Sequence, residues 1–118
     1  MRHRKTGKIL SRSKAARSAL VRDLATNLVL HEKIRTTEAK AKVVRPYIER
    51  LVTVAKAGTI AARRRAAQSL RTPAATKKII ETIAPRYRTR AGGYTRIVRI
   101  GQRQGDGATL VLIAFVEA

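Results

Sequence analysis

Residues 85–107 contain six arginines and no acidic residue before Asp106. A segment with so many like charges would repel itself in isolation, so its natural counterpart is a dense array of negative charge. A nucleic acid backbone is the commonest such array. The segment also holds the pair Gly92-Gly93, with Tyr87 on one side of the pair and Tyr94 on the other. The sequence is therefore interpreted first as that of a polyanion-binding protein.

The whole chain has the same charge bias. It carries 27 basic and 7 acidic residues, a net charge of +20 in 118 residues, which is far more than solubility requires. Arginine is twice as frequent as lysine, and its planar guanidinium matches phosphate oxygens in pairs. Charged thermophilic surfaces interleave both signs, unlike this one. The bias favours RNA or DNA as the partner.

Length and cysteine content limit the other possibilities. A chain of 118 residues suits a single domain with a modest core, and the absence of cysteine excludes disulfides, zinc ribbons and thiol nucleophiles. No apolar run of signal-peptide or membrane-span length follows the basic N-terminus. We expect cytoplasmic residence, no membrane contact and no small-molecule substrate.

Residues 1–12 hold few apolar groups and only positive charges, which indicates a basic N-terminal arm that orders on phosphates. A frayed terminus is the alternative. Residues 13–118 are expected to form one α/β domain.

Periodicity predicts the elements of that domain. A helix capped by Ser13 should end near His31, and residues 33–37 suit a short edge strand. A second helix follows Thr37 and closes at Gly58; Pro46 either kinks it or marks its start near Arg45. The further elements are a third helix capped by Thr59, a fourth opened by Thr72-Pro73 and ended by Pro85, and strands at residues 94–100 and 109–116 joined in a hairpin.

The last strand is apolar on both faces, so it should lie centrally in its sheet or have its second face covered by a partner. The predicted fold class is α+β. It is a two-layer α/β sandwich of order α-β-α-α-α-β-β, with a small three-stranded mixed sheet backed by helices.

Catalytic and metal constellations are not predicted. The seven acids are scattered, and neither His3 nor His31 has a partner at ligand spacing. The glycines at 101, 105 and 107 lead into a strand, so they indicate a hairpin turn and not a nucleotide loop. Gly92-Gly93 either admits a phosphate to the backbone or supplies a positive φ. We expect no enzyme activity, no cofactor and no metal.

Few aromatic residues are available for stacking on bases. Tyr47 and Phe115 fall on apolar faces, whereas Tyr87 and Tyr94 stand among arginines and are candidates to pack on a sugar or base. Recognition should rest on phosphates, 2′-hydroxyls and shape.

Three stretches resemble one family: MRHRKTGKILSRSKAAR at the start, IRTTEAKAKVVRP in the middle, and APRYRTRAGGYTRIVRIG with GDGATL near the end. The chain is similar over essentially its whole length to the family of protein seventeen of the bacterial large ribosomal subunit. The resemblance implies a structural ribosomal protein that binds large-subunit (23S) rRNA near the nascent-chain exit region, beside other ribosomal proteins.

The resemblance also implies where RNA contacts lie. They are expected on the arm and its continuation, near the Thr-Thr-Xaa-Xaa-Lys-Ala-Lys stretch, and around the arginine-rich segment. Together with neighbouring cations, the candidates are Arg2, His3, Arg4, Lys5, Lys8, Arg12, Lys14, Arg17, Arg35, Thr36, Thr37, Lys40, Lys42, Arg86, Arg88, Arg90, Gly92, Gly93, Tyr94 and Arg96.

Two other classes of protein share the charge. A nucleoid-type architectural DNA-binding protein usually needs an apolar wedge on an extended ribbon, and the turn at residues 101–107 has none. A small basic ribonuclease needs a histidine and carboxylate set that this sequence does not offer.

Overall fold

Side-chain caps begin three of the helices in the computed structural model, which describes residues 13–117. Ser13, Thr59 and Thr72 each accept a hydrogen bond from the backbone N–H three residues later, which satisfies an otherwise unpaired donor. The caps predicted from the sequence are confirmed. The helices they open are α1 (Lys14–His31), α3 (Ile60–Ser69) and α4 (Pro73–Lys78).

Helix α2 (Glu38–Ala55) runs without interruption through Pro46. Regular helix therefore does not start near Arg45, which settles the alternative left open by the sequence. The chain leaves α2 through Gly58, whose φ of 66° lies in the left-handed region that favours glycine.

The fourth predicted helix continues past Pro85. Helix α4 passes into a π-helical turn, η1 (Ile79–Ile83), and then into α5 (Ala84–Arg86). In this turn Ala84 donates its backbone N–H to Ile79, five residues back. Pro85 then occupies the first turn of α5, where proline's missing N–H is tolerated. The prediction that Pro85 ends the helix is wrong for this reason.

The sheet contains β1 (Lys33–Thr37), β2 (Thr95–Gln102) and β3 (Thr109–Phe115) in the order β1-β3-β2. Strand β3 is antiparallel to both neighbours, so the sheet is antiparallel and the predicted mixed sheet is corrected. The hairpin partner β2 takes one edge of β3, and β1 takes the other edge. The prediction that the apolar last strand is central is confirmed.

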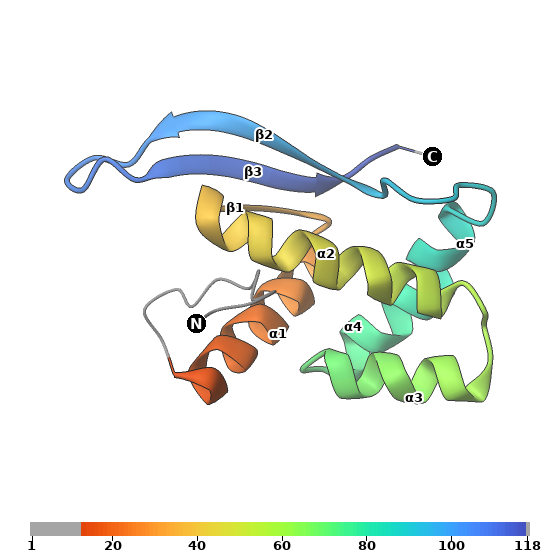
Figure 1. The fold of residues 1–118 in the computed structure, drawn as a ribbon. Helices are drawn as coiled ribbons and strands as arrows, with labels where there is room; N and C mark the ends of the chain where they lie inside the picture. The colour runs from red at the N-terminus through yellow and green to blue at the C-terminus, as the bar shows by residue number, and fades with distance from the viewer. Residues whose placement is uncertain (1–12, 118) are drawn as a thin grey trace, which may run out of the picture.

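The helices lie on one side of this sheet, with the hairpin extending beyond them (Figure 1). The core is formed between the two layers, where Leu28, Ile48, Ile79, Ile83 and Ile113 are fully buried. The α+β class, the two layers and the order α-β-α-α-α-β-β are confirmed. The predicted arm, residues 1–12, lies outside the described residues.

Candidate nucleic-acid interface

The acidic residues of the described chain divide its cations into two groups. Five carboxylates form ion pairs, which removes their partners from the free positive surface. These pairs are Asp23 with Arg71, Glu32 with Lys78 and Arg86, Glu38 with Lys42 and Arg99, Glu81 with Arg63, and Asp106 with Arg103. At the hairpin turn, the hydrogen bond from Arg103 lowers the pKa of Asp106 to about 2.

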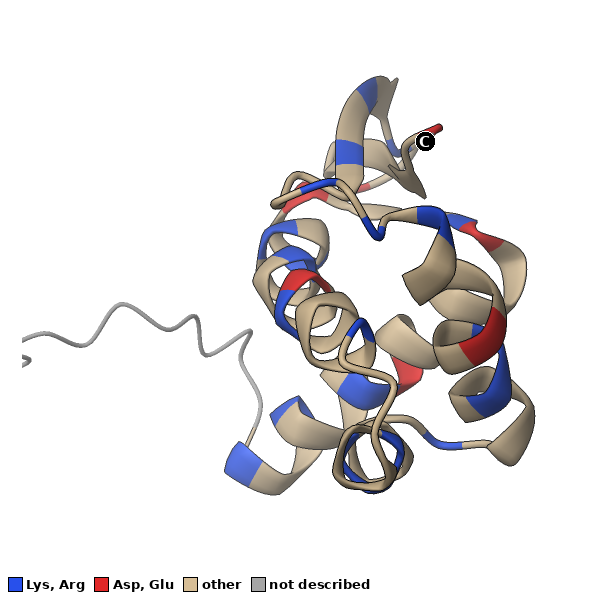
Figure 2. Cartoon of the chain, turned by 90° about the vertical axis from the view of Figure 1, so that its right-hand side faces the viewer, with Lys and Arg blue, Asp and Glu red and all other residues tan. Residues whose placement is uncertain are grey.

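The second group consists of cations that form no ion pair among residues 13–117. Figure 2 shows lysines and arginines on several helices and on the strands, with few acidic residues among them. The cations of this group include Lys14, Lys33, Arg35, Lys40, Arg45, Arg50, Arg64, Arg65, Lys77, Arg88, Arg90 and Arg96. These side chains are the available positive charge for a polyanion.

The connection between α5 and β2, residues 87–94, is here called the arginine loop. Arg88 and Arg90 within it are exposed, and it contains no acid. Glu32 fixes its beginning. This residue caps the end of α1 with a left-handed φ of 64°, accepts a hydrogen bond from Arg86 and forms an ion pair with Lys78 at 3.3 Å. The hydrogen bond from Arg86 is the main cause that lowers the pKa of Glu32, against a smaller opposing effect of burial.

Glu49 of α2 fixes the end of the arginine loop. One carboxylate oxygen accepts the backbone N–H of Tyr94 at 3.1 Å, and the other accepts the backbone N–H of Thr95 at 2.8 Å and its hydroxyl at 2.7 Å. Two turns after Glu49, at the C-terminal end of α2, Lys56 donates to the carbonyl oxygen of Arg90 at 2.6 Å and to the hydroxyl of Tyr94 at 3.1 Å.

These contacts hold the backbone at Arg90, Tyr94 and Thr95, while the side chains of Arg88 and Arg90 are exposed and Arg90 donates to the carbonyl oxygen of Gly93 at 3.5 Å. Gly93, with a φ of 66°, supplies the turn before β2. Of the two uses predicted for the glycine pair, the structure shows the positive φ, and only at Gly93. A loop that is already ordered loses less conformational entropy when it binds.

Tyr87 and Tyr94 are core residues, each 1% exposed. Their rings lie 5.3 Å apart, and Tyr87 also stacks on Phe115 at 6.2 Å. Burial raises the pKa of Tyr87, whose hydroxyl donates to the carbonyl oxygen of Val116. The prediction that these rings pack on a sugar or base is corrected, because the arginines around them in sequence point outward while the rings turn inward. Tyr94 offers no exposed side chain as an RNA contact.

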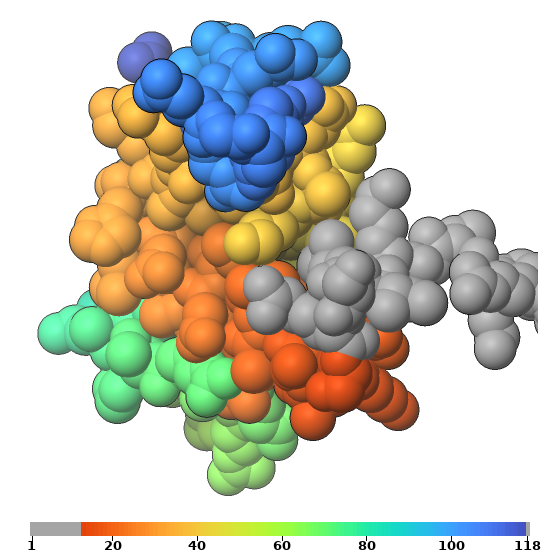
Figure 3. All heavy atoms as spheres, turned by 90° about the vertical axis from the view of Figure 1, so that its left-hand side faces the viewer, coloured from red at the N-terminus to blue at the C-terminus, as the bar shows by residue number. Residues whose placement is uncertain are grey.

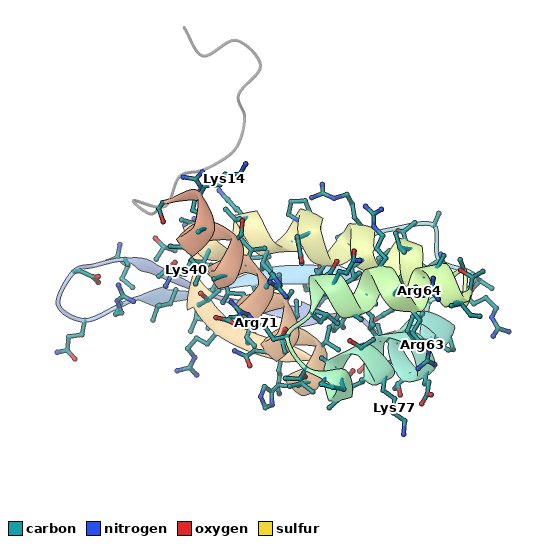
Figure 4. The ribbon with its side chains drawn as sticks, turned by 90° about the horizontal axis from the view of Figure 1, so that it is seen from below. Lys14, Lys40, Arg63, Arg64, Arg71 and Lys77 are labelled. Atoms are coloured by element: carbon teal, nitrogen blue, oxygen red, sulfur yellow. The ribbon has the colours of Figure 1, made fainter. Side chains whose placement is uncertain are left out.

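The predicted contact residues fall into two groups at opposite ends of α2. An 18-residue helix is about 27 Å long. The starts of α1 and α2 and the end of β1 share one end of the molecule with the hairpin turn (Figure 3), and Lys14 and Lys40 are on this side in Figure 4. This first group is Lys14, Arg17, Arg35, Thr36, Thr37, Lys40 and Lys42.

The second group lies at the other end of α2 and comprises Arg86, Arg88, Arg90, Gly92, Gly93, Tyr94 and Arg96. Within the two groups, Lys42 and Arg86 are held by Glu38 and Glu32. Arg2, His3, Arg4, Lys5, Lys8 and Arg12 lie outside the described residues. The two groups form one extended surface only if cations between them take part.

Five exposed cations that the predicted set omits extend the positive surface. Arg45 and Arg50 are exposed on α2 between the two groups, and Arg64, Arg65 and Lys77 are exposed on α3 and α4. Figure 4 shows Arg64 and Lys77 on the helical side, away from the sheet. A sequence signal existed for Arg50, Arg64 and Arg65, because no acid lies three or four residues from any of them.

Within residues 13–117, no helix has the length and apolar character of a membrane span. In the same range, no three histidine or acidic side chains gather as metal ligands would.

Comparison with known proteins identifies the family. The model of the family "Ribosomal protein L17" matches residues 20–116. The chain is 52% identical to the large ribosomal subunit protein bL17 of Thermomicrobium roseum, over 98% of this chain and 99% of that protein. It is 47% identical to the bL17 protein of Trichlorobacter lovleyi, over 99% and 94% of the two chains. The predicted absence of enzyme activity agrees with a family of structural proteins. The chain belongs to the ribosomal protein L17 family.

Proposed function

We propose that this protein is a structural constituent of the large ribosomal subunit that binds 23S rRNA through guanidinium and ammonium contacts with phosphates. The observation that supports this most directly is the arginine loop. Two acids, Glu32 and Glu49, hold its ends, yet neither neutralises Arg88 or Arg90. Both arginines are therefore placed on a fixed backbone with their charge available.

Family membership supports the ribosomal part of this proposal, since the relatives are large ribosomal subunit proteins. We further propose that the protein lies near the nascent-chain exit region, contacts neighbouring ribosomal proteins and resides in the cytoplasm as part of the ribosome. The arm, residues 1–12, is proposed to add RNA contacts to those of the described surface.

The mechanism is replacement of counterions on the RNA by fixed cations. Each phosphate contact made by a lysine or arginine steepens the salt dependence of binding, by roughly 0.7 to 0.9 in log–log slope. The free cations extend over several elements, so many weak contacts would together fix the protein on folded RNA.

The test measures binding of the full chain to deproteinised large-subunit rRNA between low and moderate salt, with duplex DNA as a competitor. We expect a steep slope and a preference for rRNA. The Arg88→Gln/Arg90→Gln variant should lower the slope by about 1.4 to 1.8, for two lost contacts.

The matched control is Arg63→Gln/Arg103→Gln, which removes the same charge from two arginines that already have acidic partners. This control should change the slope much less. A salt dependence that is nearly flat would refute the proposal, and equal affinity for duplex DNA would favour an architectural DNA-binding protein.

A further inference from the structure

A groove between α2 and α3 has an arginine on each wall. It is lined by Tyr47, Arg50, Leu51 and Val54 of α2 and by Arg65 and Ser69 of α3, and its volume is about 200 Å³. No acidic residue lines it. Arg50 and Arg65 are both exposed, and neither forms an ion pair within the described chain.

The walls of the groove are fixed relative to each other. The hydroxyl of Tyr47 donates to the carbonyl oxygen of Ser69 at 2.7 Å, across 22 residues of sequence. Ala62 and Ala66 of α3 are buried, and their small side chains allow close packing of the helix on the core. The spacing of the two arginines is therefore set by the fold and not by a mobile segment.

Two guanidinium groups on one groove repel each other in the free protein, and neither has an ion-pair partner in the described chain. An anion bound between the two guanidinium groups would offset their repulsion. The planar guanidinium fork matches the geometry of phosphate oxygens, and a chain of net charge +20 disfavours a second copy of itself as the occupant.

We propose that this groove binds backbone phosphates of rRNA, with Arg50 and Arg65 contacting them from opposite walls. The inference rests on the proposed function and adds a phosphate site outside the set of contact residues predicted from the sequence. On α2, the groove is lined by Tyr47, Arg50 and Val54. The residues that form hydrogen bonds to the arginine loop are Glu49, Thr53 and Lys56. On a helix with 100° per residue, these two sets occupy different flanks. RNA that crosses α2 can therefore be held on both sides of it.

The test compares Arg50→Gln/Arg65→Gln with the control Arg63→Gln/Arg103→Gln in binding to deproteinised large-subunit rRNA. Each lost guanidinium–phosphate contact should weaken binding by about tenfold, and the groove variant should lower the log–log salt slope by about 1.4 to 1.8. Arg63 is a suitable control because it lies on the same helix but pairs with Glu81 at 3.6 Å. The groove variant should unfold at the same temperature as the wild type or higher, because repulsion between two like charges has been reduced.

Equal losses in the groove and control variants would overturn the inference, since net charge alone would then explain them. Normal RNA affinity combined with poor incorporation into reconstituted large subunits would also overturn it, and would indicate an acidic protein partner in the groove. The Arg88→Gln/Arg90→Gln variant separates the two proposals. If it weakens binding and the groove variant does not, only the groove inference fails; if neither weakens binding, the proposed function fails.

Discussion

The Glu49→Gln substitution should loosen the arginine loop, although it removes a negative charge from a protein that binds a polyanion. Glutamine has nearly the same shape but only one acceptor oxygen. The present carboxylate accepts from the N–H of Tyr94, the N–H of Thr95 and the hydroxyl of Thr95, at 3.1, 2.8 and 2.7 Å. An amide NH₂ group in place of either oxygen would face a backbone donor.

The expected loss follows from these contacts. Hydrogen bonds to a charged group contribute about 1.5–3 kcal/mol each, and the substitution removes at least one of them. We expect the free energy of unfolding to fall by about 1.5–3 kcal/mol. For a domain of this size that corresponds to a decrease in Tm of roughly 6–12 °C, at about 4 °C per kcal/mol.

The assays are thermal unfolding, amide hydrogen exchange across residues 88–95, and rRNA binding. Exchange should accelerate in the arginine loop, and affinity for rRNA should fall because the loop must now be ordered on binding. If only the removed negative charge mattered, the affinity for rRNA would rise.

Glu81→Gln is the matched control. Glu81 is an exposed acid whose partner, Arg63, is 3.6 Å away and also exposed, so its loss should change stability by at most about 1 kcal/mol. The anchoring role of Glu49 would be refuted if the two variants had the same Tm. It would also be refuted if Glu49→Gln bound rRNA more tightly with unchanged amide hydrogen exchange in the arginine loop.

Two further predictions concern pH and backbone conformation. The pKa of Glu32 is lowered in the folded protein from its ordinary value of 4.5, so its contribution to stability is present above about pH 4.5 and is lost as the pH falls through the folded-state value. Acid titration of Tm should show this loss in the wild type and a smaller one in Glu32→Gln; identical titrations would contradict the assignment. Gly93→Ala should destabilise by about 1–2 kcal/mol, because Gly93 has a φ of 66°, whereas Gly92→Ala, without a positive φ and with open space at its Cβ, should be nearly neutral. Equal effects on the free energy of unfolding in the two variants would show that φ is not the cause.

The features that could be predicted from the sequence are those that depend on residues close together in the chain. Ser13, Thr59 and Thr72 cap their helices through hydrogen bonds to residues only three positions away. The apolar residues on both faces of β3 indicated its central position in the sheet. Pro85 was misjudged because the π-helical turn before it depends on the packing of Ile79 and Ile83 in the core, which no local rule describes.

The parts of the candidate interface that were missed depend on contacts between distant segments. Glu49 lies 45 residues from Tyr94, so its role as a loop anchor has no signature in local sequence. In sequence it stands four residues after Arg45, where helical spacing would favour an ion pair. Tyr87 and Tyr94 stand among arginines, and only the fold shows that their rings face the core.

The few acids of this chain determine which of its many cations are available for the proposed binding of RNA. Glu32, Glu38, Glu81, Asp23 and Asp106 each hold cations that join separate elements or close a turn, and Glu49 holds backbone donors. The remaining cations repel one another in the free protein, which opposes folding. A polyanion that binds only the folded state removes that repulsion and stabilises the fold by mass action. If the proposed function holds, folding and RNA binding are coupled through the same unpaired charges. Each acid added to the free surface should then stabilise the isolated chain while weakening its attachment to RNA.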